Sequence, residues 1–144
     1  MKTKSSLESF FRIVTVNTDL TPQQALGETN GTHHVDSSVL TTAPMGESGE
    51  VKVEFIKIGR SVTDDEIELE LVGTRPATFS EIAKANEDDP ALFDTIFNCT
   101  HWKGEEGEWC YATFHNFFGE RLVYVSRYGA VWDDRWFFAR VRNK

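Results

Sequence analysis

Alternation of apolar and polar residues first becomes clear in the middle of the chain. Residues 51–58 read Val, Lys, Val, Glu, Phe, Ile, Lys, Ile, and the alternation slips by one position after Phe55. A period of two is typical of a β-strand with one solvated face, and a slip of one residue indicates a bulge. The pattern therefore predicts a strand from Val51 to Ile58 with a local bulge.

The same period of two returns in the last 36 residues, which hold all three tyrosines and three of the four tryptophans. Aromatic and β-branched runs predict strands over 109–114, 122–128 and 136–141, with a turn at 116–120 and a loop at 128–134. Alternation places Val123 and Val125 on one face and Tyr124 on the other. In the last strand it separates Phe137, Ala139 and Val141 from Trp136, Phe138, Arg140 and Arg142. A twisted antiparallel meander of this kind can present large rings as a rigid binding face.

Between these regions the chain carries helix-start signals. Thr63 with Glu66, and Thr78 with Glu81, have the spacing of a capping box. Pro90 precedes a third short helix, predicted over 91–97. Two or three short helices thus separate the first strand from the meander.

The first fifty residues are rich in Thr, Ser, Gly and Asn. Short helices are predicted at 22–26, after Thr21, and at 37–40, after Asp36. The apolar residues of 10–16 form either a helix end or a strand that docks on the core. We therefore predict an N-terminal extension (1–50) docked on an α+β domain (51–144), with short helices packed on an antiparallel β-meander.

Charge narrows the class of partner. The formal net charge is −8; residues 1–99 contribute −9 and residues 100–144 contribute +1. An acidic body disfavours phosphate backbones, so we expect no nucleic-acid partner. No apolar run approaches the roughly 20 residues that span a bilayer, and the first residues lack a signal-peptide pattern, which predicts a soluble, cytoplasmic protein without a membrane partner.

Candidate chemistry is sparse, and we predict no catalytic residues, no metal and no cofactor. Cys99 and Cys110 flank a predicted turn and could approach each other, although two reduced thiols are favoured in an intracellular chain. With His101 and His115 they could also supply two sulfurs and two nitrogens to zinc, but the spacing matches no familiar motif. A weak metal site at His33, His34 and Asp36 is a further alternative to a plain surface loop. Acids are abundant, yet no pair stands out for catalysis.

A resemblance emerges from three groups of residues, which are the Gly73–Thr78 entry into a helix, the aromatic positions Trp102, Trp109, Tyr111 and Phe114, and the closing run 138–142. Together they resemble the C-terminal part of C-type lectin-like domains, in the bacterial and phage branch that includes formylglycine-generating-enzyme-like folds and the variable ligand-binding proteins of diversity-generating retroelements. The resemblance covers about residues 51–144. It implies a C-type lectin-like fold, a protein or surface-glycan ligand, and diversified side chains at the ligand site.

Departures limit what the resemblance carries over. The entry reads Arg, Pro, Ala, Thr, with the residue order changed, and Ala139 stands where the branch often has Gly or Cys. Nothing around Cys99 and Cys110 is similar to a formylglycine-generating site, so that activity is not expected. Trp132, Asp133 and Asp134 resemble a calcium-binding element of sugar-binding lectins, but its companion motif is missing, which favours a solvated turn.

These observations predict a non-enzymatic module that presents an aromatic and arginine surface from its C-terminal strands to a protein or glycan ligand. Tyr and Trp bury much area at a small entropic cost, and Arg adds directional hydrogen bonds. The competing interpretation is that most of these rings close the core. The alternative function is an acidic regulatory or host-interaction protein that binds a basic partner through its helix-borne carboxylates. The oligomeric state stays open. The predicted ligand-binding residues are Tyr124, Arg127, Tyr128, Trp132, Asp133, Arg135 and Trp136.

Overall fold

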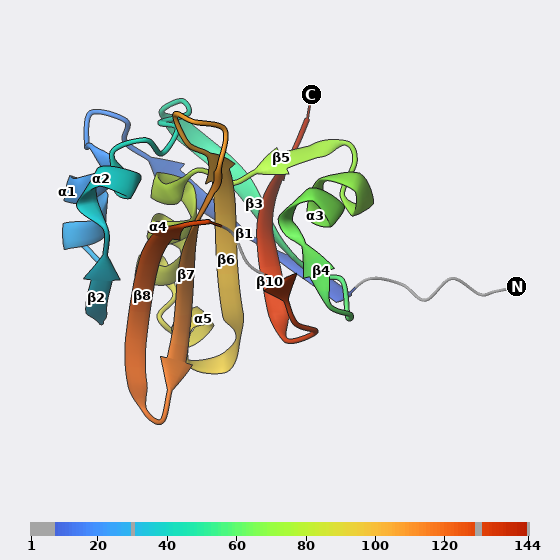
Figure 1. The fold of residues 1–144 in the computed structure, drawn as a ribbon. Coiled ribbons are helices and arrows are strands. Elements are labelled where there is room, and N and C mark those ends of the chain that lie inside the picture. Colours follow the sequence, from blue (N-terminus) through green and yellow to red (C-terminus); the bar gives the residue numbers. More distant parts are fainter. Residues whose placement is uncertain (1–7, 30, 129–130, 144) are drawn as a thin grey trace, which may run out of the picture.

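A mixed β-sheet forms the centre of the computed structural model, which describes residues 8–29, 31–128 and 131–143 (Figure 1). Its strands lie in the order β1-β3-β10-β6-β7-β8-β2, and β5 pairs with β10 beside this path. The antiparallel strands β6, β7 and β8 form a meander. Short helices pack on this sheet, so the predicted α+β class is confirmed. The strands are β1 (Glu8–Val16), β2 (Thr32–Val35), β3 (Gly49–Lys57), β5 (Thr74–Pro76), β6 (Phe97–Lys103), β7 (Trp109–Phe117), β8 (Glu120–Arg127) and β10 (Trp136–Arg142).

Four helices cover one face of the sheet: α1 (Pro22–Gly27), α2 (Ser37–Leu40), α4 (Phe79–Asp88) and α5 (Ala91–Thr95). The capping box predicted at Thr78 and Glu81 begins α4, and Thr21 with Gln24 forms another one at α1. Beneath the helices lies the larger core cluster, in which Phe79 and Phe93 pack against Phe114 of β7. Val123 and Val125 also belong to this cluster, as their period of two predicts.

The opposite face carries a smaller layer over part of its width. This layer contains α3 (Asp64–Glu70) and the two-stranded ribbon of β4 (Val62–Thr63) and β9 (Val131–Trp132). The capping box at Thr63 and Glu66 begins α3, as predicted. Ile67 and Trp132 pack there with Phe138 of β10 in a second core cluster.

The last strand does not extend the meander. Strand β10 lies between β3 and β6, antiparallel to β3 and parallel to β6. It therefore has a hydrogen-bonded strand at each edge. Its two faces are covered as well, one by the larger core cluster and the other by the second cluster. Phe137 and Ala139 belong to the larger core cluster and Phe138 to the second, so the predicted alternation is confirmed.

The bulge predicted after Phe55 is wrong. Strands β1 and β3 pair in one unbroken register from Glu8 opposite Lys57 to Val16 opposite Gly49. Phe55 faces the four helices, and Ile56 faces the second core cluster. Two consecutive apolar residues occur because both faces of the sheet are covered at this point, which a single-face pattern does not anticipate.

The apolar residues 10–16 adopt the strand alternative, as part of edge strand β1. Helix α1, helix α2 and strand β2 of the first fifty residues also join the same fold, and β2 pairs with β8 in parallel. None of the helices in the described part of the chain is long and apolar enough to cross a membrane.

Candidate ligand-binding groove

A groove of about 430 Å³ lies on the face opposite the four helices, where the layer of α3 and β9 ends. The floor of the groove is formed by alternate residues of β7 and β8. In β7, Ala112 and Phe114 point toward the helices, so Thr113 and His115 point the other way, into the groove. Strand β8 contributes Leu122 and Tyr124 in the same manner. The lining residues are Phe97, Tyr111, Thr113, His115, Phe117, Leu122, Tyr124, Val131, Trp132, Arg135 and Trp136.

A row of rings runs across five strands at this groove. His34 of β2 stacks on Tyr124 with centroids 4.8 Å apart, and Tyr124 stacks on His115 at 5.8 Å. The His115 ring then contacts Phe97 at 5.1 Å and Trp136 at 5.7 Å. Because each ring restricts the next, the floor is a largely preformed surface, which lowers the entropic cost of binding.

A guanidinium group stands at one wall. The Cζ atom of Arg135 lies 4.7 Å from the centroid of the Phe97 ring. Asp133 accepts hydrogen bonds from the Arg135 side chain at 2.8 and 3.2 Å, and these bonds lower the pKa of the Asp133 carboxyl group. The Arg135 side chain is still 61% exposed. It can therefore donate further hydrogen bonds to a ligand.

His115 is neutral at pH 7. Burial lowers its pKa below the ordinary value, and the positive charge of Arg135 lowers it further. Its Nδ1 atom is buried without a hydrogen-bond partner, so protonating both ring nitrogens would leave one N–H unsatisfied. The groove thus presents a neutral imidazole among apolar rings.

The predicted site residues divide into several groups. Tyr124, Arg135 and Trp136 line the groove, and Tyr124 is 37% exposed. Trp132 also borders it, but its side chain is buried in the second core cluster and its indole N–H donates to Asp64. For Trp132 the structure therefore favours the interpretation that the ring closes the core.

The remaining predicted residues lie beside the groove or on the other face. Arg127 has the same parity as Val123 and Val125, so it points to the helix-bearing face, where it donates to Ser38 Oγ. Tyr128 is exposed, with φ at 65°, and residues 129 and 130 of the predicted loop lie outside the described residues. Asp133 is held by Arg135, so the carboxylate that resembled a calcium ligand already has a partner.

Sequence reasoning missed Phe97, Thr113 and His115. The predicted helix over 91–97 is wrong at its end: α5 stops at Thr95, and Phe97 is the first residue of β6, a strand that was not predicted. For β7 the signal was available: alternation from Tyr111 places Thr113 and His115 on the same face as the tyrosine ring.

A buried ionic cluster lies under α3, next to the groove but not in it. The two nitrogens of His101 face Asp64 Oδ1 at 2.7 Å and Glu68 Oε2 at 2.5 Å. Arg140 is 1% exposed and donates to both oxygens of Glu68, at 2.7 and 3.1 Å. An imidazolium can donate to both carboxylates at once, so this arrangement favours the protonated form of His101.

The pKa values agree with that assignment. Burial alone would lower the pKa of His101, but its hydrogen bonds to Asp64 and Glu68 outweigh burial and raise it. Burial would likewise raise the pKa of Glu68, yet the hydrogen bonds from His101 and Arg140 bring it to about 2. With both nitrogens engaged, His101 is not placed to act as a general base. Nearby Cys99 is fully buried, and burial raises the pKa of its thiol, which disfavours a nucleophilic thiolate.

The structure separates the two cysteines. Cys99 lies opposite Thr113 and Cys110 lies opposite Trp102, and the two thiols belong to different core clusters on opposite faces of the sheet. Both are free. The alternative zinc set of these cysteines with His101 and His115 is therefore not brought together. Within the described residues no group of three or more His, Cys, Asp or Glu side chains has an arrangement that could hold a metal ion.

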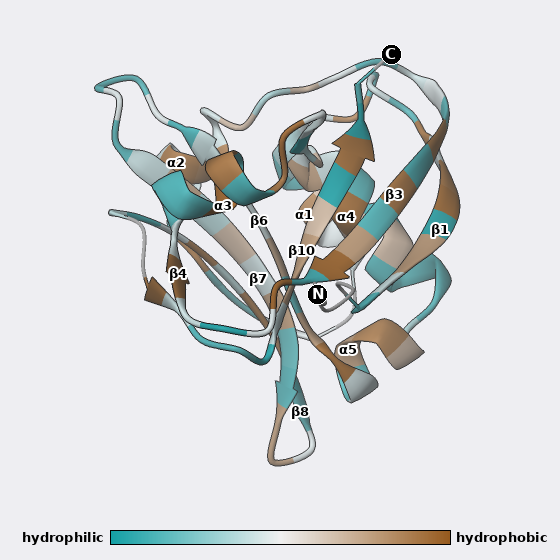
Figure 2. Cartoon of the chain, turned by 90° about the vertical axis from the view of Figure 1, so that its right-hand side faces the viewer, coloured by the Kyte–Doolittle hydropathy of each residue, from teal (hydrophilic) through white to brown (hydrophobic). Residues whose placement is uncertain are grey.

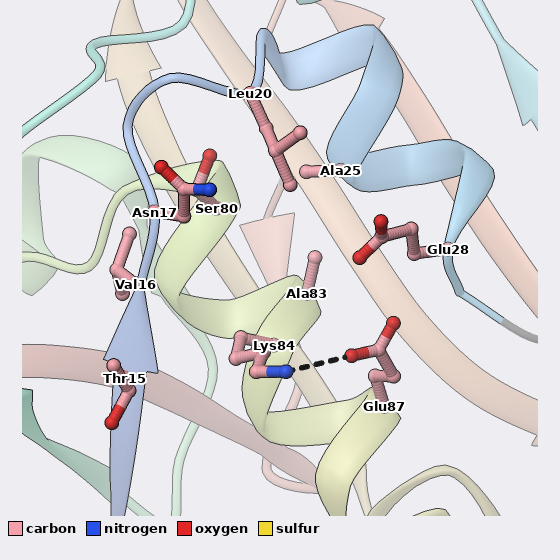
Figure 3. Close-up of a pocket in the computed structure, with 10 residues that line it drawn as sticks. All are labelled: Thr15, Val16, Asn17, Leu20, Ala25, Glu28, Ser80, Ala83, Lys84 and Glu87. Carbon is pink, nitrogen blue, oxygen red and sulfur yellow. Dashed lines mark hydrogen bonds and ion pairs between the residues drawn. The ribbon is translucent and has the colours of Figure 1, made fainter. Parts of the chain in front are cut away.

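A second cavity, of about 300 Å³, lies between the end of β1, helix α1 and helix α4 (Figure 3). Glu28, just after the end of α1, and Glu87 of α4 both line this cavity, and Lys84 donates to Glu87 at 3.0 Å. Lys84 also pairs with Asp88 at 3.3 Å. The Lys84 ammonium group is therefore already paired with two carboxylates of its own helix, which makes it less available to a ligand than the exposed Arg135 guanidinium group of the aromatic groove.

Comparison with known protein families, with curated proteins and with solved structures finds no match. The C-type lectin-like resemblance of residues 51–144 therefore stays a prediction.

Proposed function

We propose that this chain is a non-enzymatic binding module whose aromatic groove receives a protein or glycan ligand. The observation that carries the proposal is the row of rings from His34 to Trp136 on a sheet face that α3 leaves uncovered. Apolar lining with a few polar groups is typical of ligand sites. Here the polar groups are the hydroxyls of Tyr111, Thr113 and Tyr124, the His115 imidazole and the Arg135 guanidinium.

An apolar side chain of a protein partner suits this groove better than a purely polar ligand, because rings dominate its floor. A glycan is the second ligand class, since a sugar ring can stack on an aromatic side chain while Arg135 and Tyr124 bond its hydroxyls. The two buried free thiols support a reducing, cytoplasmic location.

The alternative function, recruitment of a basic partner by helix-borne carboxylates, finds less support. In α3, Asp64 and Glu68 turn inward to His101. In the other acidic stretch, Asp89 pairs with Arg12 and Asp94 with Arg121. Carboxylates that already have cationic partners attract a further basic partner weakly.

Two screens test the proposal: peptide-display libraries are panned against the protein, and the protein is applied to glycan arrays. We expect binders whose affinity falls at least about tenfold, or ~1.4 kcal/mol, in the Tyr124→Ala and Arg135→Ala variants. Ile13→Ala is the matched control, because Ile13 is a 56% exposed apolar side chain of β1 outside the groove. Binders that lose affinity with Ile13→Ala but not with Tyr124→Ala would contradict the proposal, and so would the absence of binders from both libraries.

A further inference from the structure

The hairpin of β7 and β8 ends in two exposed phenylalanines. Phe117 is 52% exposed and Phe118 is 93% exposed, and their ring centroids lie 4.4 Å apart. The hairpin projects beyond the rest of the sheet (Figures 1 and 2). Scattered apolar residues are normal on a surface, but two adjacent rings at a projecting tip form a compact apolar anchor.

The backbone of this tip is strained. Phe118 has φ at 52° and Gly119 has φ at 84°, the left-handed conformations of a two-residue hairpin turn. That turn favours Asn-Gly, and a side chain such as Phe at the first position costs roughly 1–2 kcal/mol. Phe118 destabilises the turn and exposes its ring to water, so neither its backbone nor its side chain benefits the isolated chain. A contact between this ring and another molecule would account for both the strained backbone and the exposed ring.

Tip and groove adjoin each other on one face. Phe117 itself borders the groove, and Leu122 and Tyr124 continue from the hairpin into its floor. A surface that carries an apolar projection beside an apolar hollow is self-complementary under a two-fold rotation, because each copy offers what the other lacks.

Charge permits two copies to meet at this face. Although the chain carries −8, Arg135 pairs with Asp133 beside the groove, and Glu120 near its edge accepts a hydrogen bond from Thr32. The groove lining itself holds one guanidinium and no carboxylate among the described residues. Two copies approaching here meet nearly neutral surfaces, whereas approach through the acidic remainder meets repulsion.

We infer that the groove's occupant is the Phe117–Phe118 tip of a second copy of this chain, in a two-fold dimer in which each tip fills the other groove. This inference rests on the proposed function, since it assigns the apolar ligand of the same groove. A ligand from elsewhere then competes with self-association, and dissociation of the dimer opens the site.

Sedimentation velocity across micromolar to millimolar concentrations tests the dimer. We expect a concentration-dependent shift from monomer to dimer that Phe118→Ser abolishes. Val131→Asp, which adds a carboxylate at the 69% exposed rim of the groove, should abolish it as well. Phe11→Ser is the control, because Phe11 is a 48% exposed ring on β1 and its loss should leave the dimer unchanged. A monomer at every concentration overturns the inference, as does a dimer that survives Phe118→Ser.

Mixing the two variants distinguishes tip-in-groove contact from other pairings. Phe118→Ser keeps an intact groove and Val131→Asp keeps an intact tip, so each is monomeric alone, but together they restore one of the two contacts. We expect the mixture to associate more weakly than wild type and more strongly than either variant, and no association in the mixture overturns the arrangement. If wild type is monomeric while panned binders still depend on Tyr124, the dimer fails and the proposed function stands. If a dimer forms that Phe118→Ser and Val131→Asp both abolish, but no binder selected against the Phe118→Ser variant depends on Tyr124, the proposed function fails and the dimer stands.

Discussion

At the scale of single residues, Arg140 differs from the other C-terminal arginines. Its side chain is 1% exposed, and besides Glu68 it donates to the hydroxyl oxygen of Thr74 at 2.9 Å. Arg142, two residues on and on the same face, is 68% exposed and pairs with Glu54. A buried ionic group depends on its partners, whereas an exposed ion pair contributes little.

Replacing Arg140 with Ala should lower the free energy of unfolding by about 3–5 kcal/mol, because Glu68 loses a buried cationic partner and the strand loses its bonds to Thr74. Arg142→Ala is the matched control and should cost less than about 1 kcal/mol. Urea denaturation of both variants measures the difference. Equal losses for the two arginines would contradict the assigned role of the buried cluster.

Sequence alternation predicted the face on which Arg140 lies but not its burial. Burial follows from α3, which is distant in the chain and packs over β10 through contacts that no local pattern records. The same limit applies to Trp132 and Tyr124: both are aromatic and both were predicted to bind ligand, yet α3 covers the first and leaves the second open.

At the scale of elements, the β7–β8 turn holds a residue that its conformation disfavours. Phe118→Asn should raise the free energy of unfolding by about 1 kcal/mol, because Asn tolerates the left-handed conformation at φ 52° better than Phe. Urea denaturation measures the gain, and sedimentation velocity should show that the same variant no longer dimerises. A stability loss with Phe118→Asn would mean that the ring stabilises the fold of the isolated chain instead.

The docking of α3 should depend on pH through His101 and Glu68. The folded pKa of His101 is raised above 6.5, so its contribution is complete below pH 6.5 and is lost as pH rises through the folded pKa. The folded pKa of Glu68 is about 2, so its contribution is present above pH 4.5 and is lost as pH falls toward 2. We therefore expect these two groups to stabilise the fold most between about pH 4.5 and 6.5.

Denaturation midpoints measured across pH check this expectation, with His101→Gln as the variant that removes the decline above pH 6.5. His34→Gln serves as the control, because His34 is an exposed residue of β2. A decline of the same size in wild type and His101→Gln would assign the pH dependence to other groups.

Several elements could be predicted from the sequence because their signals are local. The starts of α3 and α4 follow from the capping boxes at Thr63 and Thr78, and the strand faces of β8 and β10 follow from alternation. The insertion of β10 between β3 and β6 could not be predicted, because parallel pairing of strands distant in sequence leaves no mark in either strand. Strand β2 is four residues long, too short for periodicity to show.

At the scale of the whole molecule, the fold has two layers of unequal width on the two faces of one sheet. The helices α1, α2, α4 and α5 cover their face broadly, whereas α3 and the β4–β9 ribbon cover part of theirs (Figure 1). The groove lies in the part of that second face which α3 and the β4–β9 ribbon leave uncovered.

The salt dependence of ligand affinity distinguishes binding at the aromatic groove from the alternative function, binding of a basic partner by carboxylates. Ligands of the aromatic groove should keep their affinity within about tenfold between low salt and a few hundred millimolar salt, because burial of rings is not screened. Isothermal titration at the two salt concentrations measures this. A partner that is lost at high salt would favour the acidic alternative.

The central claim, that the groove is the binding surface, is tested most directly by NMR titration of isotope-labelled Phe118→Ser protein with a binder selected by panning. We predict that the amide shifts which change most belong to the strands lining the groove, around Thr113, His115 and Tyr124, while those of α1 and α4 stay fixed. Shift changes centred on the helix-bearing face or on the edge strand β1, with the residues around Tyr124 unmoved, would contradict the account.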